Sequence, residues 1–230
     1  MNWTAQLSKY LILSCVGVAF CQSTPPAPQR APLRQAFDLQ VRWNPTAVRV
    51  LGASYLEYEL HLTNFAADAL SLSRIAVVDA ESGAILGDFR GAKLQDLIGR
   101  IDPAGQKDCL LVPPAVHVTA YLSVPVMPGG SAPRTLRHRV EYHDAQGSGD
   151  GAAVLEGGVV TVRDLPPLPL GPPLRGGPWV AIYGSDWEHG HRRMLYAVNG
   201  TVRIPGRFAI DFIVDWHESC GTFDLFSATG

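Results

Sequence analysis

Apolar and polar residues alternate in short segments throughout residues 37–162, and this alternation constrains the fold more than any other feature of the sequence. Successive side chains of a β-strand point to opposite faces, so a period of two gives each strand one apolar and one polar edge. The clearest segment carries on its apolar edge Leu56, Tyr58, Leu60 and Leu62. Its polar edge carries Glu57, Glu59 and His61. We therefore predict β-strands that each place one face in a core.

Departures from the alternation locate the other elements. The apolar positions slip by one residue at Arg74, which predicts a β-bulge. Residues 79–83 have the composition of a turn, and apolar residues at helical spacing predict one helix over residues 92–101. Further strands are predicted over residues 116–126, 136–142 and 154–162. With about seven short strands and one helix, residues 37–164 are predicted to form an immunoglobulin-like antiparallel β-sandwich, so the fold class is mainly β.

A proline-rich segment separates this sandwich from a second part of the chain. Residues 165–178 contain six prolines, which remove backbone donors and fix φ, so no sheet can continue through them. Residues 22–36 form a similar proline-rich tether ahead of the sandwich. Residues 179–230 are predicted to form a small, incomplete β unit with a type I′ hairpin turn at Asn199 and Gly200. Its strands are predicted over residues 179–183, 193–198, 201–204 and 208–212.

The first 21 residues have the pattern of a secretory signal peptide. Lys9 precedes an apolar run, residues 10–21, that is too short to span a bilayer as a helix. Small residues at the end of the run predict cleavage between Cys21 and Gln22. We therefore expect export to the periplasm or the extracellular space, with no transmembrane span after signal removal. Two alternatives are a buried N-terminal helix and a lipoprotein with its lipid on Cys15 or Cys21.

The charge balance bears on the partners of the chain. A formal net charge of −2 gives no basic field for nucleic acid and no cationic face for anionic lipid, so we expect neither partner. The apolar fraction of 47% is sufficient for a packed core. Removal of residues 1–21 leaves Cys109 and Cys220, and two cysteines outside the cytosol could form one disulfide.

Three phrases in the second part of the chain carry a family resemblance. They are residues 171–183, residues 190–200 with the sequence GHRR, and residues 206–212 with the sequence RFAIDF. Together they resemble the beginning of the catalytic module of lysostaphin/LytM-type zinc metallopeptidases, which are peptidoglycan endopeptidases. Many members of that family place an all-β domain ahead of the module, as this chain does. The resemblance implies an exported protein whose partner is cell-wall peptidoglycan or a periplasmic protein.

The resemblance also implies a zinc site. In the family, zinc is held by a His and an Asp of an H-x-x-x-D segment and by a later His of an H-x-H strand. Asp211 matches the aspartate ligand, but Arg207 stands where the histidine would be, and a guanidinium has no lone pair for a metal. No H-x-H follows Asp211 in this sequence. We therefore expect no tightly bound zinc and no catalytic residue in this chain, although complete relatives bind zinc.

The histidines offer few substitutes for the missing ligands. His189 and His191 have a spacing that can chelate a metal, and His191 is kept as a second candidate ligand because it could join Asp211 from across the hairpin. His138 lies on the apolar edge of its strand, which predicts a core histidine. Three histidines on polar edges are predicted to be exposed: His61, His117 and His143. His217 falls in a tail with no clear period, and we expect no function there.

Two functions from different classes fit these patterns. The first is an exported lysostaphin/LytM-like protein whose complete relatives hydrolyse the peptide cross-links of the bacterial cell wall. It would be inactive as this chain, because the sequence ends soon after the first metal motif. The second is a non-enzymatic periplasmic β-sandwich module that binds a protein or a glycan. An H-x-H strand encoded downstream of Gly230 would distinguish the two.

We predict that the mature protein begins at or near Gln22. A short apolar run that ends in small residues is the substrate of signal peptidase. N-terminal sequencing of the exported protein measures this start directly. A soluble cytosolic protein that retains Met1 would overturn the expectation of export.

Overall fold

The protein is described by a computed structural model at residues 36–50, 52–100, 108–127, 132–145, 152–166, 169, 171–176, 179–182 and 190–214. All of these residues belong to one compact unit, Arg34–Gly230. The predicted signal peptide, residues 1–21, and its cleavage site lie outside the described residues, as do residues 22–35 of the tether.

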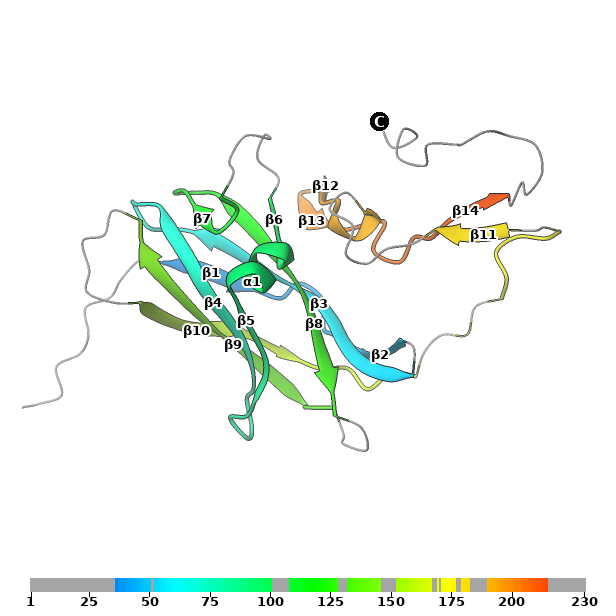
Figure 1. The fold of residues 1–230 in the computed structure, drawn as a ribbon, viewed down its shortest axis with the longest axis horizontal. Coiled ribbons are helices and arrows are strands. Elements are labelled where there is room, and N and C mark those ends of the chain that lie inside the picture. Colours follow the sequence, from blue (N-terminus) through cyan, green and yellow to red (C-terminus); the bar gives the residue numbers. More distant parts are fainter. Residues whose placement is uncertain are drawn as a thin grey trace, which may run out of the picture. The chain divides into compact units, whose positions relative to one another are not determined.

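Two antiparallel sheets form the main part of the fold (Figure 1). One sheet contains β1 (Phe37–Gln40), β2 (Ala47–Val50), β3 (Ala53–Asn64), β6 (Ile98–Arg100) and β8 (His117–Val126). Its order is β1-β3-β8-β6, with β2 also beside β3, and we name it the β3–β8 sheet. The other contains β4 (Leu70–Asp79), β5 (Ile85–Arg90), β7 (Leu111–Val112), β9 (Thr135–Asp144) and β10 (Ala153–Thr161). Its order is β10-β9-β4-β5, with β7 also beside β4, and we name it the β4–β9 sheet.

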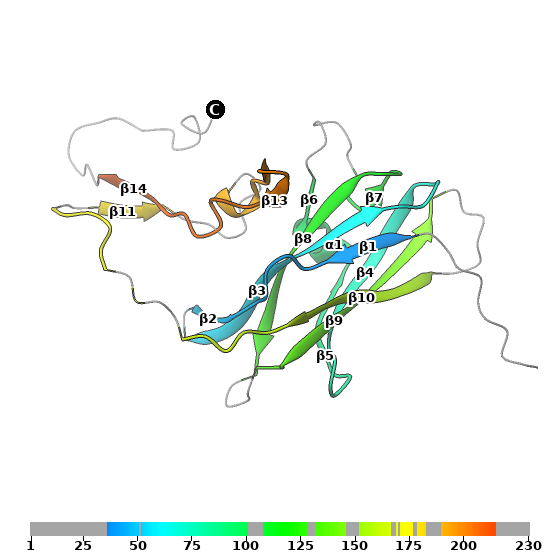
Figure 2. The same cartoon turned by 180° about the vertical axis from the view of Figure 1, so that it is seen from behind.

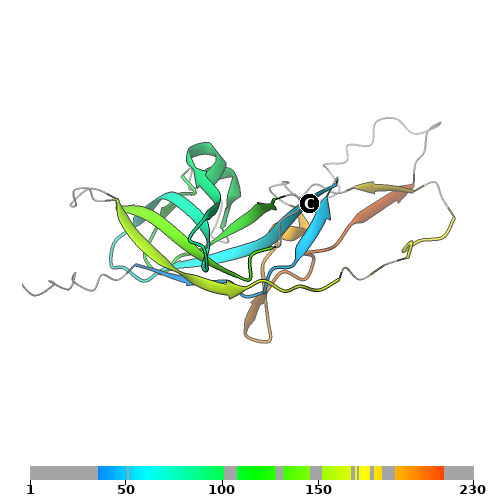
Figure 3. The same cartoon turned by 90° about the horizontal axis from the view of Figure 1, so that it is seen from below.

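The two sheets lie face to face, which Figure 3 shows along a second direction. Strands β1 and β2 share one edge of β3, with Gln40 paired to His61 and Ala47 paired to Leu56 (Figure 2). Residues 41–46, between β1 and β2, therefore interrupt the pairing along this edge of β3. The predicted mainly β class and the antiparallel β-sandwich are confirmed.

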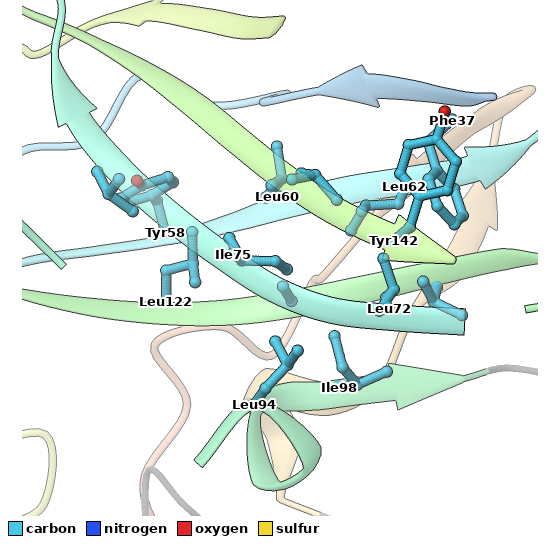
Figure 4. Close-up of a cluster of buried hydrophobic side chains, with 14 of the residues drawn as sticks. Phe37, Tyr58, Leu60, Leu62, Leu72, Ile75, Leu94, Ile98, Leu122 and Tyr142 are labelled. Atoms are coloured by element: carbon cyan, nitrogen blue, oxygen red, sulfur yellow. The ribbon is translucent and has the colours of Figure 1, made fainter. Parts of the chain in front are cut away.

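The core between the sheets is built from the apolar edges that the alternation predicted (Figure 4). The four apolar residues of β3 are fully buried: Leu56, Tyr58, Leu60 and Leu62. The facing sheet contributes residues of β4 and β9, among them Leu72, Ile75, Leu136 and Val140. At one end of the core, the rings of Phe37 and Tyr142 meet edge to face with centroids 5.5 Å apart. Burial of this apolar surface is the main favourable contribution to folding.

His138 of β9 is a core histidine, as predicted, with no exposed surface. Its Nε2 lies 2.8 Å from the Tyr58 hydroxyl oxygen, and its Nδ1 lies 3.0 Å from the carbonyl oxygen of Gly158. Both ring nitrogens therefore have partners inside the core. Gly158 has a φ of +60°, and a Cβ there would lie 3.0 Å from His138 Nδ1, so a glycine is needed at this position.

The register of the strands tests two local predictions. The pairing of β4 with β9 shifts between Leu72 and Arg74, which confirms the predicted β-bulge. The predicted helix is right in kind and wrong at its end, because α1 spans Gly91–Leu97 and β6 follows at once. Ile98 pairs with Ala120 of β8, so strand pairing at the sheet edge replaces the last helical turn.

No helix in the described part of the chain is long and apolar enough to cross a membrane.

Both predicted turns are confirmed. In the turn after β4, the amide of Gly83 donates to the carbonyl oxygen of Asp79 at 2.9 Å. In the C-terminal hairpin, Asn199 and Gly200 have φ values of 51° and 74°. Positive φ at both central positions is what a type I′ turn requires.

The C-terminal unit, defined as the described residues 179–182 and 190–214, contains two small two-stranded sheets. In one, β11 (Trp179–Ile182) pairs with β14 (Asp211–Val214). In the other, β12 (Tyr196–Val198) pairs with β13 (Thr201–Arg203). A single turn of 3-10 helix, η1 (His191–Arg193), precedes β12.

Two predicted strands of this unit are corrected. The strand expected from residue 193 begins at Tyr196, because Arg193 still belongs to η1. The strand expected over residues 208–212 begins at Asp211, because residues 205–208 form a turn. Pro205 at the start of that turn has no backbone N–H to donate to a sheet. Arg207 and Asp211 therefore do not lie on one strand.

We predict that Leu60→Ala destabilises the fold by about 2–5 kcal/mol, because it removes a fully buried side chain and leaves a cavity. The free energy of unfolding in urea measures the change. Val154→Ala is the control, since Val154 is 55% exposed and its truncation should change the free energy by less than about 0.5 kcal/mol. Equal effects of the two substitutions would contradict the placement of the core.

Candidate functional site

The two residues that the sequence singles out as metal ligands, His191 and Asp211, contact each other. His191 Nε2 lies 2.9 Å from Oδ2 and 3.1 Å from Oδ1 of Asp211. Asp211 is the first residue of β14 and pairs with Ile182 of β11, whereas His191 is the first residue of η1. A Cβ on Gly206 would lie 3.0 Å from His191 Cβ, so the glycine allows the turn at residues 205–208 to approach η1 closely.

This arrangement suits a hydrogen bond, and it is close to the spacing of two ligands on one metal ion. Zinc lies about 2.0–2.2 Å from a histidine nitrogen or a carboxylate oxygen, so two such ligands of a tetrahedral ion are about 3.3–3.5 Å apart. A small outward movement of either side chain would admit the ion. The His191 and Asp211 side chains are 43% and 59% exposed, so water can reach the position between them.

The pair supplies two ligands of the three or four that a protein zinc site uses. The described residues contain no group of three or more His, Cys, Asp or Glu side chains that could hold a metal. His189, the other histidine with chelating spacing, lies outside the described residues, as do His217 and Cys220. His191 and Asp211 therefore fit a partial zinc site.

The Arg207 side chain contacts Glu59 of the sandwich, although the family pattern would place a metal ligand at this position. The family pattern places a metal ligand four residues before Asp211, on the same strand. Here the Arg207 guanidinium contacts Oε2 of Glu59 at 2.5 Å. Arg207 therefore binds a carboxylate of strand β3, and the residue that approaches Asp211 is His191.

A hollow of about 440 Å³ adjoins the pair. His191 forms part of its wall, and the rest is largely apolar, with Met194, Tyr196 and Pro205 among the lining residues.

The outer face of the β3–β8 sheet differs from the prediction. Cross-strand pairing places Glu57 opposite Ser123, Glu59 opposite Tyr121, and His61 opposite Thr119. The alternation predicts that these polar edges are exposed, yet Glu59 and His61 are only 3% and 4% exposed. Residues of the C-terminal unit cover this face, as the contact between Arg207 and Glu59 shows. The burial of this charged face of β3 under the C-terminal unit was not predicted from the sequence, although two carboxylates at alternate positions, Glu57 and Glu59, were a visible sign of it.

Two histidines on this face contact each other. His61 Nδ1 lies 3.1 Å from His117 Nε2, and the Thr63 hydroxyl lies 3.0 Å from His117 Nδ1. Burial lowers the pKa of both imidazoles, and the charge of Arg42 lowers each pKa further. Both rings are therefore neutral near pH 7. His61, His117 and Thr63 therefore form a hydrogen-bond network. The positive charge of Arg42 opposes the binding of a cation there.

The remaining sequence-based candidates are easily placed. His143 is exposed, as predicted, and His117 is half-buried, whereas an exposed side chain was predicted. The Cys109 thiol donates to the carbonyl oxygen of Gln95 at 3.5 Å. Because Cys220 lies outside the described residues, the suggested disulfide stays a prediction.

Comparisons with known proteins give structural matches at low sequence identity and no match in sequence. No protein-family model matches the chain, and no curated protein matches it in sequence. An X-ray structure of a Northeast Structural Genomics Consortium target, SoR45, covers 63% of this chain and 100% of its own chain, at 12% identity and a TM-score of 0.34. The ASH / PapD-like domain 7 of human CEP192 covers 64% and 99%, at 16% identity and a TM-score of 0.28. At these scores neither structure bears on the function of this chain.

We expect the free energy of unfolding to fall as the pH drops below about 6.5. Burial lowers the pKa of His61 to about 3 and that of His138 to about 4. Between these values and about 6.5 the unfolded chain binds a proton at each histidine and the folded chain does not, so acid favours unfolding. Each histidine should contribute a slope of about 1.4 kcal/mol per pH unit in its window.

Urea unfolding at several pH values measures this slope. His61→Gln should reduce the uptake of protons on unfolding by about one. His143→Gln is the matched control, because His143 is exposed and its replacement should leave the slope unchanged. The same slope in the parent protein and in His61→Gln would contradict the burial of a neutral His61.

Proposed function

We infer that this chain is an exported protein of the lysostaphin/LytM-like type and that His191 and Asp211 belong to its zinc site. The observation that carries the inference is the 2.9 Å approach of His191 Nε2 to Asp211, the residue that matches the aspartate ligand of that family. The two residues are twenty positions apart, and the fold of the hairpin brings them together. In complete relatives the zinc site, with its histidine four residues before the aspartate, serves the hydrolysis of cell-wall peptides.

The side chains of this site have distinct tasks. Without a metal, Asp211 orients the imidazole of His191 by accepting a hydrogen bond from Nε2. To hold zinc, Nε2 would have to be unprotonated, and a carboxylate oxygen of Asp211 would be the second ligand. Zinc, when bound, supplies a water molecule that ionises near neutral pH and can attack a peptide carbonyl. In a site with all its ligands, the mostly apolar hollow next to His191 would be the place for a peptide segment.

The site as it stands in these 230 residues is incomplete. A catalytic zinc takes three protein ligands and a water, and this sequence has no H-x-H after Asp211. Arg207 does not make up the difference, because it contacts Glu59 and has no lone pair to donate. We therefore propose that this chain alone binds zinc weakly and hydrolyses no cell-wall peptide.

The test is zinc titration of the full chain by calorimetry. We expect a binding free energy well below the roughly 10–16 kcal/mol of complete structural zinc sites. Both Asp211→Ala and His191→Ala should abolish the binding. His143→Ala, which alters an exposed histidine elsewhere, should leave it unchanged.

Cell-wall digestion, followed as turbidity, is measured alongside. The proposal expects no clearance by the chain alone. Zinc binding that survives both substitutions would remove the proposed site and favour the alternative, a non-enzymatic β-sandwich that binds a periplasmic protein or a glycan. Tight binding together with clearance would overturn the statement that the site is incomplete.

A further inference from the structure

The C-terminal unit has almost no core of its own. Among residues 179–182 and 190–213, Ile204 is the only one that is buried, at 8% exposure. Large apolar side chains of the same unit remain open to solvent, including Tyr196, Phe208 and Ile213. Two two-stranded sheets without a shared apolar core are not expected to be stable alone. Within the described part of the chain, contacts with the sandwich are what stabilises the unit.

Two arginines of the unit meet two glutamates of β3. Nη1 of Arg192 lies 2.7 Å from Oε2 of Glu57, and its Nε lies 3.4 Å from Oε1 of Glu59. Arg207 contacts the other oxygen of Glu59 at 2.5 Å. The side chains of Arg192, Arg207 and Glu59 are 10%, 14% and 2% exposed, so the pairs made by Glu59 are shielded from water, whereas Glu57 is 25% exposed. We name these four residues the arginine–glutamate clamp.

The clamp is matched in charge. Burial raises the pKa of Glu59, while the charges of Arg207 and Arg192 act in the opposite direction. A shielded carboxylate that loses its partner is strongly destabilised, because neither water nor another charge compensates for it. Two carboxylates on the outer face of β3 therefore pair with two guanidiniums of the C-terminal unit, and the charges of the two parts balance.

An aromatic contact adds to the clamp. The Tyr121 hydroxyl of β8 donates to the carbonyl oxygen of Arg193 at 3.1 Å, and the Arg193 guanidinium lies 5.2 Å from the centre of the tyrosine ring. Gly99 of β6 makes room for this ring, since a Cβ at that position would lie 2.6 Å from a ring carbon of Tyr121. Arg193 also donates to the carbonyl oxygen of Asp96 at 2.8 Å.

We propose that the arginine–glutamate clamp holds the C-terminal unit on the sandwich and thereby positions His191 against Asp211. Arg192 follows His191 directly in η1, and Arg207 lies four residues before Asp211, so the clamp grips both segments that carry the pair. Arg207 is thus a positioning residue at the place where the family resemblance would put a metal ligand. The proposal rests on protein contacts and holds whether or not zinc binds.

Hydrogen exchange of the full chain, followed by mass spectrometry, tests the clamp. In the double variant Arg192→Ala/Arg207→Ala, amides of residues 196–207 should exchange at least about tenfold faster, because the hairpin loses its attachment. Amides of residues 136–142 in the far sheet should exchange as before. Arg139→Ala is the control, because it removes an ion pair to Glu156 on the far sheet, where both side chains are more than a third exposed.

Two further variants separate docking from general damage. Arg207→Lys keeps the charge and should retain most of the protection that Arg207→Ala loses. Glu59→Gln removes the clamp from the other side and should increase exchange in the same residues, 196–207. Unchanged exchange there in the double arginine variant would overturn the proposal, as would an equal increase in both sheets, which would indicate unfolding of the whole sandwich.

Discussion

Strand β3 is fully buried on its inner face and largely covered on its outer face, and the rest of the structure depends on how each face is covered. The inner row packs in the sandwich core, where apolar burial stabilises it. The outer row carries the carboxylates of Glu57 and Glu59, which apolar contacts cannot stabilise. Charged partners are required there, and Arg192 and Arg207 provide them. One strand therefore links the sandwich to the C-terminal unit through two different kinds of interaction.

This link gives a physical meaning to the phrases GHRR and RFAIDF. Each contributes one arginine that reaches β3 and one residue of the His191–Asp211 pair. The arginines lie next to the pair in sequence but point to the sandwich, so attachment and the candidate metal ligands are divided between neighbouring residues. The sandwich is in this view a platform for the C-terminal unit, and the proline-rich linker of residues 165–178 joins parts that also meet through side chains.

The sequence predicted those features that depend on local pattern. The inner row of β3, the slip at Arg74 and the hairpin at Asn199 are each encoded within a few neighbouring residues. The end of α1 was missed because Ile98 pairs with a strand that lies some twenty residues further on. The burial of His61 was also missed because it depends on residues distant in the chain. Alternation identifies the apolar face of a strand, but it does not indicate whether another part of the chain covers the polar face. The approach of His191 to Asp211 could be anticipated from the hairpin between them. The ion pair between Arg207 and Glu59 joins residues far apart in the chain, and no local pattern indicates it.

The most direct test of this account is a double-mutant cycle between Arg207 and Glu59. The free energies of unfolding of the parent chain, Arg207→Ala, Glu59→Gln and the double variant give the interaction energy of the pair. The account predicts a coupling above about 1 kcal/mol, larger than the roughly 0.2–1 kcal/mol typical of exposed pairs, for which Arg139 and Glu156 provide the internal reference. A coupling no larger than that of the reference pair would contradict the claim that the arginine–glutamate clamp holds the C-terminal unit in place.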